Sequence, residues 1–287
     1  MKSKMKEVPC PRRNMTEKEL SRVHELELVI AEEIKRICVK HHISYFMIAG
    51  TLLGAVRHGG FIPWDEDMDF GMTRKNYEHF VRACRKDLDN TRFFLQTMDT
   101  DPGYTYAFAK IRLRGTVFTE ALAKDSKAMS GIFVDIFPFD HVPRNRFLEK
   151  LHERERYLWK NILAVKLGYG NGAKRPFPLR AALFAISRLL PADFIRARKK
   201  IAFTRYNKRP ASRLVTAEGS YRYMKEKIPV RYIRNLIMMP FMDTEFPAFA
   251  EFELYLRAMY GDYMKLPPED QRNKHNILGV DFGPYEI

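Results

Sequence analysis

The sequence has few cysteines and no long apolar run, and each absence excludes a class of protein. Its 287 residues include three cysteines, which stand far apart at Cys10, Cys38 and Cys84. This number and spacing exclude a disulfide scaffold and a cysteine-based zinc cluster, and they fit a reducing compartment. The most apolar stretch, 181–186, is about a third as long as a membrane crossing, and residues 1–20 lack the apolar centre of a signal peptide. We therefore expect a cytoplasmic protein without a transmembrane helix.

Positive charge is abundant but confined to one part of the chain. The sequence holds 50 Lys and Arg against 35 Asp and Glu, a net charge of +15. Residues 144–234 contain 24 of the basic residues and 6 of the acidic ones, so this segment alone carries +18 and the remainder −3. A field of that size attracts phosphate groups, whether these belong to nucleic acid, anionic lipid or a phosphorylated glycan.

The first half of the chain alternates between helical and strand-like patterns, which predicts a mixed α+β unit. Thr16 begins a helix in a capping box with Glu19, and Thr73 caps a later helix. A short helix is expected over 52–57, directly after the first strand. Short β-branched and aromatic runs predict strands over 43–49, 67–71, 93–96, 106–114, 117–120 and 131–137.

From Arg144 onward the pattern changes to basic helices, expected over 147–167, 179–190 and 192–206. A last helix is expected after Pro247, where apolar residues recur at helical spacing from Phe249 onward. We expect one compact unit in three parts. These are a core over 16–143, a basic helical insertion over 144–245, and a helix and tail over 246–287 that complete the core.

Four carboxylates crowd into the segment 63–70, which reads PWDEDMDF: Asp65, Glu66, Asp67 and Asp69. On the expected strand, alternation sends Asp65, Asp67 and Asp69 to one face. Their like charges repel, and the apolar neighbours make that repulsion costlier. A divalent cation removes the cost, and hard oxygen ligands suit Mg²⁺ or Mn²⁺. The pattern therefore predicts a metal site, and an acidic surface turn is the alternative.

A corner of small residues, Gly50 and Thr51, follows the first expected strand. Such a corner lets backbone N–H groups approach phosphate oxygens, and the following helix directs its positive end toward them. Arg57 lies about two helical turns further on, where it could contact a phosphate or form a surface salt bridge. We expect Gly50, Thr51 and Arg57 to bind the phosphates of a donor, although a Gly-Thr pair alone indicates only a turn.

Asp135 is a single carboxylate in an apolar strand, within the run GIFVDIFPFD. A charged side chain in such a strand is seldom without a partner. Asp135 is therefore either a buried structural residue or, as we predict, a third metal ligand and general base that faces Asp67 and Asp69. Asp140 lies beyond a proline and is expected to be exposed.

Lys110 and Arg112 alternate with apolar residues in another expected strand, so they share one face of it. Two cations on a sheet face can neutralise a leaving phosphate. A solvated sheet face is the alternative. With the aspartates and the small-residue corner, these cations would complete a site for phosphoryl transfer.

The order of these motifs resembles the nucleotidyltransferase fold of the polymerase-β superfamily. Whole phrases are similar to the LicD family, the bacterial phosphocholine transferases related to fukutin. The phrases are GTLLGAVRHGGFIPWDEDMDFGMTRKNYEHF, YTYAFAKIRLRGTVFTE, GIFVDIFPFD and LYLRAMYGDYMKLPPEDQRNKH, with Glu66 where family members often carry aspartate. The resemblance implies a polymerase-β-like nucleotidyltransferase core over 16–143, and the basic segment matches least.

The family implies transfer of phosphocholine from CDP-choline to a hydroxyl of a cell-surface glycan, such as a teichoic acid, lipopolysaccharide or capsule precursor, with release of CMP. Asp67 and Asp69 would hold the metal on the diphosphate, and Asp135 would complete the metal site and accept the hydroxyl proton. Choline also requires aromatic faces. Candidates for these are Trp64, Tyr104, Tyr106, Tyr260 and Tyr263.

Rival functions follow from the same residues. A relative with this metal site could transfer glycerol phosphate or ribitol phosphate, which would need hydrogen-bonding side chains in place of aromatic ones. A nucleotide-adding or nucleic-acid-binding protein would suit the net charge, but the sequence has no RNA-binding motif, so no nucleic acid is expected.

Basic residues surround two apolar stretches of the basic segment, 181–190 and 194–203. This mixture predicts interfacial helices, apolar on one side and rich in Lys and Arg on the other. Because acceptors in the family are often glycans on a lipid carrier, we expect peripheral contact with the anionic inner face of a membrane. An ordinary helical subdomain with a solvated basic face, or binding of a soluble acceptor, would give the same pattern.

Overall fold

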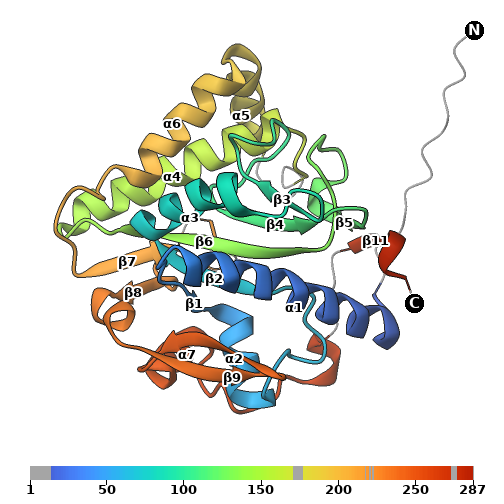
Figure 1. Cartoon of the computed structure of the whole chain (residues 1–287). Coiled ribbons are helices and arrows are strands. Elements are labelled where there is room, and N and C mark those ends of the chain that lie inside the picture. The colour runs from blue at the N-terminus through green and yellow to red at the C-terminus, as the bar shows by residue number, and fades with distance from the viewer. Residues whose placement is uncertain are drawn as a thin grey trace, which may run out of the picture.

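The computed structural model describes residues 14–170, 177–216, 218–219, 221, 223–272 and 277–286. Within these residues the chain forms a seven-stranded mixed sheet, two small two-stranded sheets and seven α-helices (Figure 1). The prediction of a mixed α and β fold is therefore confirmed. Cys10 lies outside the described residues.

The central sheet joins strands from both halves of the chain. Its main path runs β1 (Phe46–Met47), β2 (Asp69–Thr73), β6 (Phe133–His141), β4 (Ala109–Leu113) and β3 (Phe93–Gln96). The β2–β6 pair is parallel and the other pairs are antiparallel. The last residues of β6 also pair with β7 (Arg213–Thr216), and β7 pairs with β8 (Lys227–Pro229). Strand β6 thus pairs with three strands, β2, β4 and β7, and is the central strand of the sheet.

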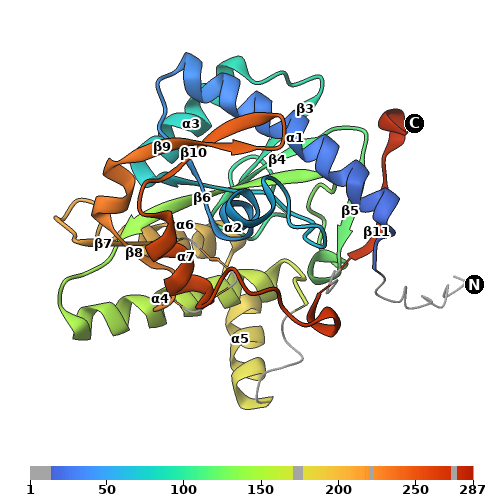
Figure 2. The ribbon, with the colours of Figure 1, turned by 90° about the horizontal axis from the view of Figure 1, so that it is seen from below.

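Two helices of the first half pack on the sheet because each has a continuous apolar face. Helix α1 (Glu17–Lys40) begins with the predicted Thr16–Glu19 capping box, and α3 (Arg74–Asp87) begins with the predicted cap at Thr73. Both contact β6, and they contact each other. Figure 2 shows them on one side of β6, with α4, α5 and α7 on the opposite side.

The basic segment begins with three helices, as predicted. These are α4 (Arg146–Lys166), α5 (Phe177–Leu189) and α6 (Ala192–Thr204), and α4 packs against both of the others. The expectation that the segment stays helical as far as residue 245 is wrong, because β7, β8 and β9 (Leu236–Phe241) follow α6. Buried Leu214, Val215 and Ile228 supply the apolar contacts of β7 and β8.

The end of the chain also differs from the prediction. Phe249 does not belong to a helix: it ends β10 (Thr244–Phe249), which pairs with β9, and α7 (Phe252–Tyr260) starts after it. Beyond α7, β11 (Ile277–Asp281) pairs with β5 (Val117–Glu120), far back in the sequence. Within the described residues, no helix combines the length and the apolar character needed to cross a bilayer.

Two elements near the aspartates have boundaries that matter for the site. The first strand is only β1, and α2 (Ala49–His58) starts three residues earlier than predicted, with Ile48 as its cap residue. The second strand starts at Asp69 and not at Asp67. The prediction that Asp65, Asp67 and Asp69 alternate along one strand is therefore wrong, since only Asp69 belongs to β2.

Candidate active site

A cavity of about 220 Å³ opens where β2, β6 and β4 meet the start of α2 and the turn after β7. Its walls combine carboxylates with aromatic rings. The acidic residues are Asp67, Asp69, Glu120, Asp135, Glu218 and Glu226. The aromatic residues are Tyr106, Phe108, Phe133, Phe137, Phe139, Tyr221 and Tyr255. Among the described lining residues Lys110 is the single lysine or arginine, so acidic side chains outnumber basic ones in the cavity wall.

Strand register places three charged residues in a row across the sheet. Asp69 of β2 is the register partner of Asp135 of β6, and Asp135 is in turn the partner of Lys110 of β4. All three line the cavity, as does Asp67, two residues before β2. The structure thus brings together Asp67, Asp69, Asp135 and Lys110, four of the residues predicted for the site.

The carboxylates at this row are held close to one another against their mutual repulsion. Loss of solvent and the charge of Asp69 raise the pKa of Asp67 well above its usual value. Loss of solvent and the charge of Asp135 do the same to the pKa of Asp69. These shifts mean that the protein alone does not neutralise the pair, and a cation bound between them would.

Lys110 neutralises part of this charge. Its Nζ lies 3.1 Å from Asp135 Oδ1 and 3.6 Å from Glu120 Oε2, and it lies over the Phe133 ring. Burial nevertheless raises the pKa of Asp135 to about 6, with Lys110 opposing the shift. Lys110 also donates a hydrogen bond to Asp135 Oδ2 at 3.4 Å, while Oδ1 has only the ion-pair contact with Lys110 among the described residues. Oδ1 therefore keeps the capacity to accept a proton or a metal ion.

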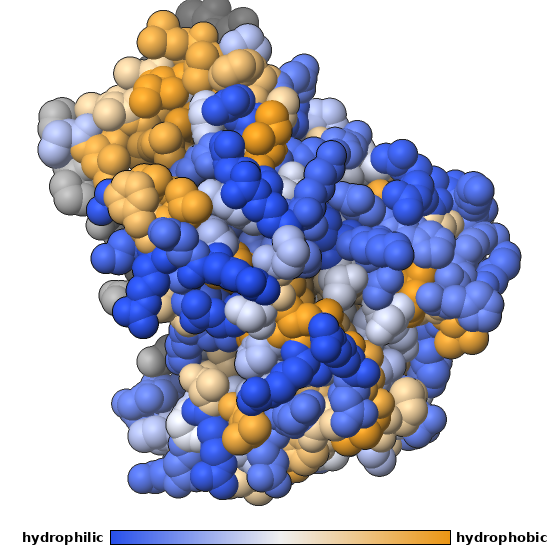
Figure 3. Space-filling model, turned by 90° about the vertical axis from the view of Figure 1, so that its left-hand side faces the viewer, coloured by the Kyte–Doolittle hydropathy of each residue, from blue (hydrophilic) through white to orange (hydrophobic). Residues whose placement is uncertain are grey.

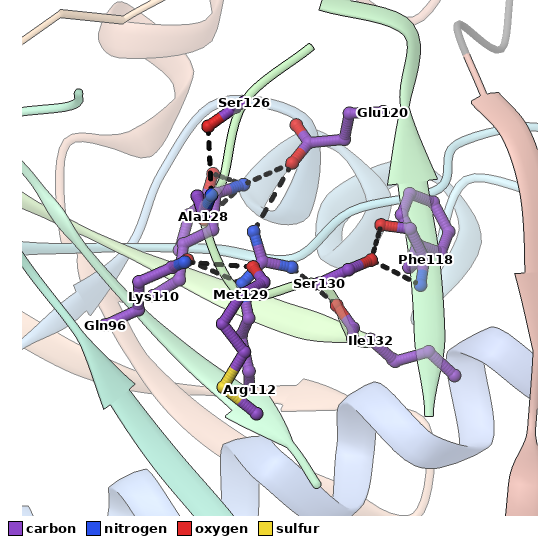
Figure 4. Close-up of polar contacts among 12 residues, drawn as sticks. Gln96, Lys110, Arg112, Phe118, Glu120, Ser126, Ala128, Met129, Ser130 and Ile132 are labelled. Carbon is purple, nitrogen blue, oxygen red and sulfur yellow. Dashed lines mark hydrogen bonds and ion pairs between the residues drawn. The ribbon is translucent and has the colours of Figure 1, made fainter. Parts of the chain in front are cut away.

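Arg112 lies behind the cavity and does not line it. It donates to Gln96 Oε1 at 2.5 Å and to the Gly131 carbonyl at 2.6 Å, and it lies 3.5 Å from Glu120 (Figure 4). Both Lys110 and Arg112 are buried, so the alternative of a solvated sheet face is wrong. Loss of solvent raises the pKa of Glu120, but the charges of Lys110 and Arg112 outweigh that effect and hold this pKa below its usual value.

The first turn of α2 is hydrogen-bonded to the start of the aspartate strand β2. The hydroxyl of Thr51 accepts a hydrogen bond from the Asp69 N–H at 2.7 Å, and the Ala49 N–H donates to the Tyr255 hydroxyl at 3.0 Å. A Cβ atom on Gly50 would lie 2.5 Å from Asp65 Oδ2. Gly50, Thr51 and Asp65 therefore form the layer beside the cavity and do not line it.

Two further predicted residues lie elsewhere. Arg57 donates to the carbonyl of Tyr263 at 3.0 Å and lies over the Trp64 ring, away from the cavity. Asp140, expected to be exposed, is fully buried, and it accepts hydrogen bonds from Arg74 Nε at 2.8 Å and from Arg74 Nη2 at 2.7 Å. That expectation was wrong because β6 continues through Pro138 to His141.

The donor set fits a hard divalent cation. Within the described residues no group of three or more His, Cys, Asp or Glu side chains is already arranged as a metal site. Magnesium in phosphoryl-transfer sites is commonly bound by one or two carboxylates together with substrate phosphates, and it does not require an all-protein cage. Asp67 and Asp69, together with Asp135, the register partner of Asp69, meet that requirement.

Sequence reasoning missed several acidic residues. Glu218 is held by Lys199 of α6 at 2.8 Å and accepts from the Ala107 N–H, while Glu226 accepts from the Thr216 hydroxyl at 2.7 Å. Glu218 and Glu226 are two of the six acidic residues in the basic segment. Their rarity there was a signal that could have marked them as functional candidates. Glu27, buried on the apolar face of α1, is a further acidic residue that sequence reasoning missed. Burial, assisted by the charges of nearby carboxylates, raises its pKa.

Of the five aromatic residues predicted to hold choline, Tyr106 lines the cavity. Tyr104 is buried beside it, with ring centroids 5.5 Å apart. Trp64 lies under the Arg272 guanidinium and Tyr260 beside Tyr221. Two rings that the sequence did not suggest extend the aromatic wall from Tyr106. Tyr106 stacks on Phe108 with ring centroids 5.0 Å apart, and the ring centroids of Phe108 and Phe137 lie 4.3 Å apart.

Comparison with known proteins shows which family this chain belongs to. A family model described as "LicD/FKTN/FKRP, nucleotidyltransferase domain" matches residues 42–162, which include Asp67, Asp69, Lys110 and Asp135. The lipopolysaccharide cholinephosphotransferase LicD of Haemophilus influenzae is 30% identical over 254 residues, which are 87% of this chain and 93% of that protein. The chain belongs to the LicD family.

Other similarities cover less of the chain. The human ribitol 5-phosphate transferase FKRP is 30% identical over 113 residues, 38% of this chain and 19% of FKRP. An uncharacterized protein of Rickettsia typhi is 41% identical over 51 residues, 18% of this chain. The family model ends before Glu218 and Glu226, so these two cavity residues belong to the part of the LicD-family chain that it does not cover.

Proposed function

We propose that this LicD-family chain transfers phosphocholine from CDP-choline to a hydroxyl of a glycan and releases CMP. We include in this proposal a nucleotidyltransferase-like core, as the description of the matching family model suggests. The names of two relatives support the class of reaction, since one is a cholinephosphotransferase and the other a ribitol 5-phosphate transferase. The observation that carries the choice of choline is the aromatic and negative lining of the cavity.

The choice between choline and a polyol rests on what each alcohol needs. A trimethylammonium group has no hydrogen-bond donor, and it binds best against aromatic faces and near negative charge. Ribitol or glycerol would need donors and acceptors at each hydroxyl. Tyr106, Phe108 and Phe137 line the cavity with aromatic rings. Glu226, and Glu218 in its pair with Lys199, line it on the β7 side. This lining favours choline.

The proposed metal is Mg²⁺ or Mn²⁺, held by Asp67, Asp69 and Asp135, and it would neutralise the charge of the donor diphosphate. Lys110 adds a fixed positive charge beside Asp135. Asp65, Gly50 and Thr51 act on this site by positioning, because they lie in the layer beside the cavity.

Asp135 is the proposed general base. A carboxyl with a pKa of about 6 is mostly ionised at neutral pH and still basic enough to accept a proton. As the acceptor hydroxyl oxygen bonds to the phosphorus that bears choline, its proton passes to Asp135. The bond from that phosphorus to the bridging oxygen breaks, and CMP leaves with the bridging oxygen. Positioning and charge neutralisation do most of the work.

Binding and turnover of a panel of CDP-alcohols test the proposal. With Mg²⁺ present, we expect CDP-choline to bind about tenfold more tightly than CDP-ribitol or CDP-glycerol. Tyr106→Leu keeps bulk but removes the ring face, and it should erase that preference. Tyr157→Ala, at an exposed tyrosine of α4, is the control. Equal binding of all three donors, or CMP release from CDP-ribitol alone, would contradict the choice of choline.

A further inference from the structure

Helix α5 leaves most of its apolar side chains in contact with solvent. Its sequence, FPLRAALFAISRL, contains no acidic residue, and its two charged residues are Arg180 and Arg188. Phe184 is 54% exposed and Leu189 82% exposed. A surface helix of a soluble protein normally presents charged and polar residues to water. The outer face of α5 is instead apolar, and no other described part of the chain covers it.

The apolar surface continues onto the start of α6. Phe194 is exposed there, next to the turn that joins α5 to α6. Figure 3 shows apolar side chains gathered over the upper part of the molecule, where α5 and α6 lie in Figure 1. We call the exposed residues of this region the α5–α6 patch. It consists of Leu179, Arg180, Phe184, Arg188, Leu189 and Phe194.

The charge of the patch is positive. Residues 177–204 contain six Lys or Arg and one acidic residue, Asp193, which pairs with Arg196 at 2.7 Å. The Arg188 guanidinium lies over the Phe184 ring, 5.3 Å from its centroid, so apolar and cationic groups are neighbours on this surface. Such a surface suits contact with a lipid layer whose headgroups carry negative charge.

We propose that the α5–α6 patch docks on a membrane surface that contains anionic lipid. Leu179, Phe184, Leu189 and Phe194 would enter the boundary between headgroups and acyl chains, and Arg180 and Arg188 would contact lipid phosphates. A second copy of this chain is a poorer occupant, because a two-fold contact would bring two positively charged patches together. An acidic protein partner is the remaining alternative, and a lack of preference for anionic vesicles in the test below would favour it.

The docking would also orient the cavity. Helix α6 carries Lys199, whose Nζ lies 2.8 Å from the cavity residue Glu218. A membrane-bound α6 would thus hold one wall of the cavity at a fixed distance from the lipid surface. The inference rests on the proposed function only for its purpose, which is access to a glycan built on a lipid.

Co-sedimentation with vesicles tests the proposal. The wild-type chain should bind phosphatidylcholine vesicles that contain phosphatidylglycerol about tenfold better than vesicles of phosphatidylcholine alone, and high salt should release it. Phe184→Glu combined with Leu189→Glu should abolish binding. Val39→Glu, at an exposed valine of α1, should leave it unchanged. Arg188→Glu should weaken binding more than Lys86→Glu, at an exposed lysine of α3.

CMP release from a soluble donor, measured without vesicles, should be the same for all of these variants, so failure of docking is distinguishable from failure of the proposed chemistry. Equal weak binding to both kinds of vesicle would overturn the proposal. The proposal would also be overturned if the Phe184 and Leu189 double variant bound anionic vesicles as tightly as the wild-type chain. Without vesicles, concentration-dependent self-association that the double variant abolishes would instead assign the patch to a contact between copies.

Discussion

The hydroxyl of Thr51 accepts a hydrogen bond from the backbone N–H of Asp69 at 2.7 Å. This bond joins the first turn of α2 to the first residue of β2, and Asp69 is the register partner of Asp135. The sequence suggested that Thr51 contacts phosphate. In the structure its hydroxyl oxygen accepts a hydrogen bond from the aspartate row. We therefore propose that Thr51 is a positioning residue.

Substitutions at Thr51 should separate its hydroxyl from its shape. Thr51→Val leaves the Asp69 N–H without its acceptor in a buried place, which should cost about 1–3 kcal/mol of stability. It should also slow CMP release, because Asp69 loses its anchor. Thr51→Ser keeps the hydroxyl and should retain most of both. Thermal unfolding and CMP release check this, and a Val variant equal to wild type in both would refute the positioning role.

The aspartate pair makes opposite predictions for activity and stability. Asp67→Asn and Asp69→Asn should each lower transfer by more than roughly tenfold, because each removes a proposed ligand charge. Without metal, each should raise the melting temperature by about 2–4 °C, since one member of a repelling pair becomes neutral. The exposed Asp262→Asn is the control for both measurements.

Asp65→Asn should lose less activity than either of these variants, because Asp65 contacts the layer at Gly50 and does not line the cavity. The assignment fails if Asp67→Asn or Asp69→Asn keeps more than about a tenth of wild-type turnover.

Local signals in the sequence predicted local structure well. The capping box of Thr16 with Glu19 and the cap at Thr73 are confirmed, because a helix start depends on residues within one turn. The strand through the aspartates was placed too early. Asp and Pro are poor strand residues, so PWDED stays irregular and β2 begins only at Asp69.

Contacts between distant residues could not be predicted. Asp140 was expected to be exposed because Pro138 seemed to end the strand, yet β6 continues, and the partner that neutralises Asp140 is Arg74, 66 residues away. Lys110 meets Asp135 only because of the β4–β6 register. The aromatic wall and Glu218 likewise depend on which strands become neighbours, information that is absent from local patterns.

Asp135 and Lys110 should affect different kinetic parameters. Asp135→Asn keeps shape but cannot accept a proton, so kcat should fall more than donor affinity. Lys110→Met removes a positive charge beside the donor site, so donor affinity should fall as well. Steady-state kinetics with CDP-choline check both. An Asp135→Asn enzyme with unchanged kcat and weaker donor binding would make Asp135 a binding residue and not the base.

His152 of α4 should make the fold sensitive to acid. Its Nε2 lies 2.9 Å from the Ala202 carbonyl, which can only accept, so Nε2 carries the hydrogen and Nδ1 accepts from the Tyr223 hydroxyl at 3.1 Å. Burial, assisted by Arg156, lowers the pKa of His152 to about 4 from its usual 6.5. The neutral ring is therefore the form that the fold accommodates.

The sign of the effect follows from proton binding. Between pH 6.5 and about 4 the unfolded chain binds a proton at His152 and the folded chain does not, so stability is lost as pH falls through this window. The loss should amount to about 3 kcal/mol by the lower end. His152→Gln should be less stable at neutral pH but should lose correspondingly less on acidification, because it cannot titrate.

Urea unfolding of wild type and His152→Gln between about pH 7.5 and pH 4.5 isolates this contribution, since the other titrating groups are common to both proteins. His42→Asn is the control: His42 is exposed, and asparagine tolerates its left-handed backbone. The control should follow the wild-type pH dependence. If His152→Gln also follows it, His152 does not contribute to acid unfolding, and the buried carboxylates around the cavity become the groups to examine.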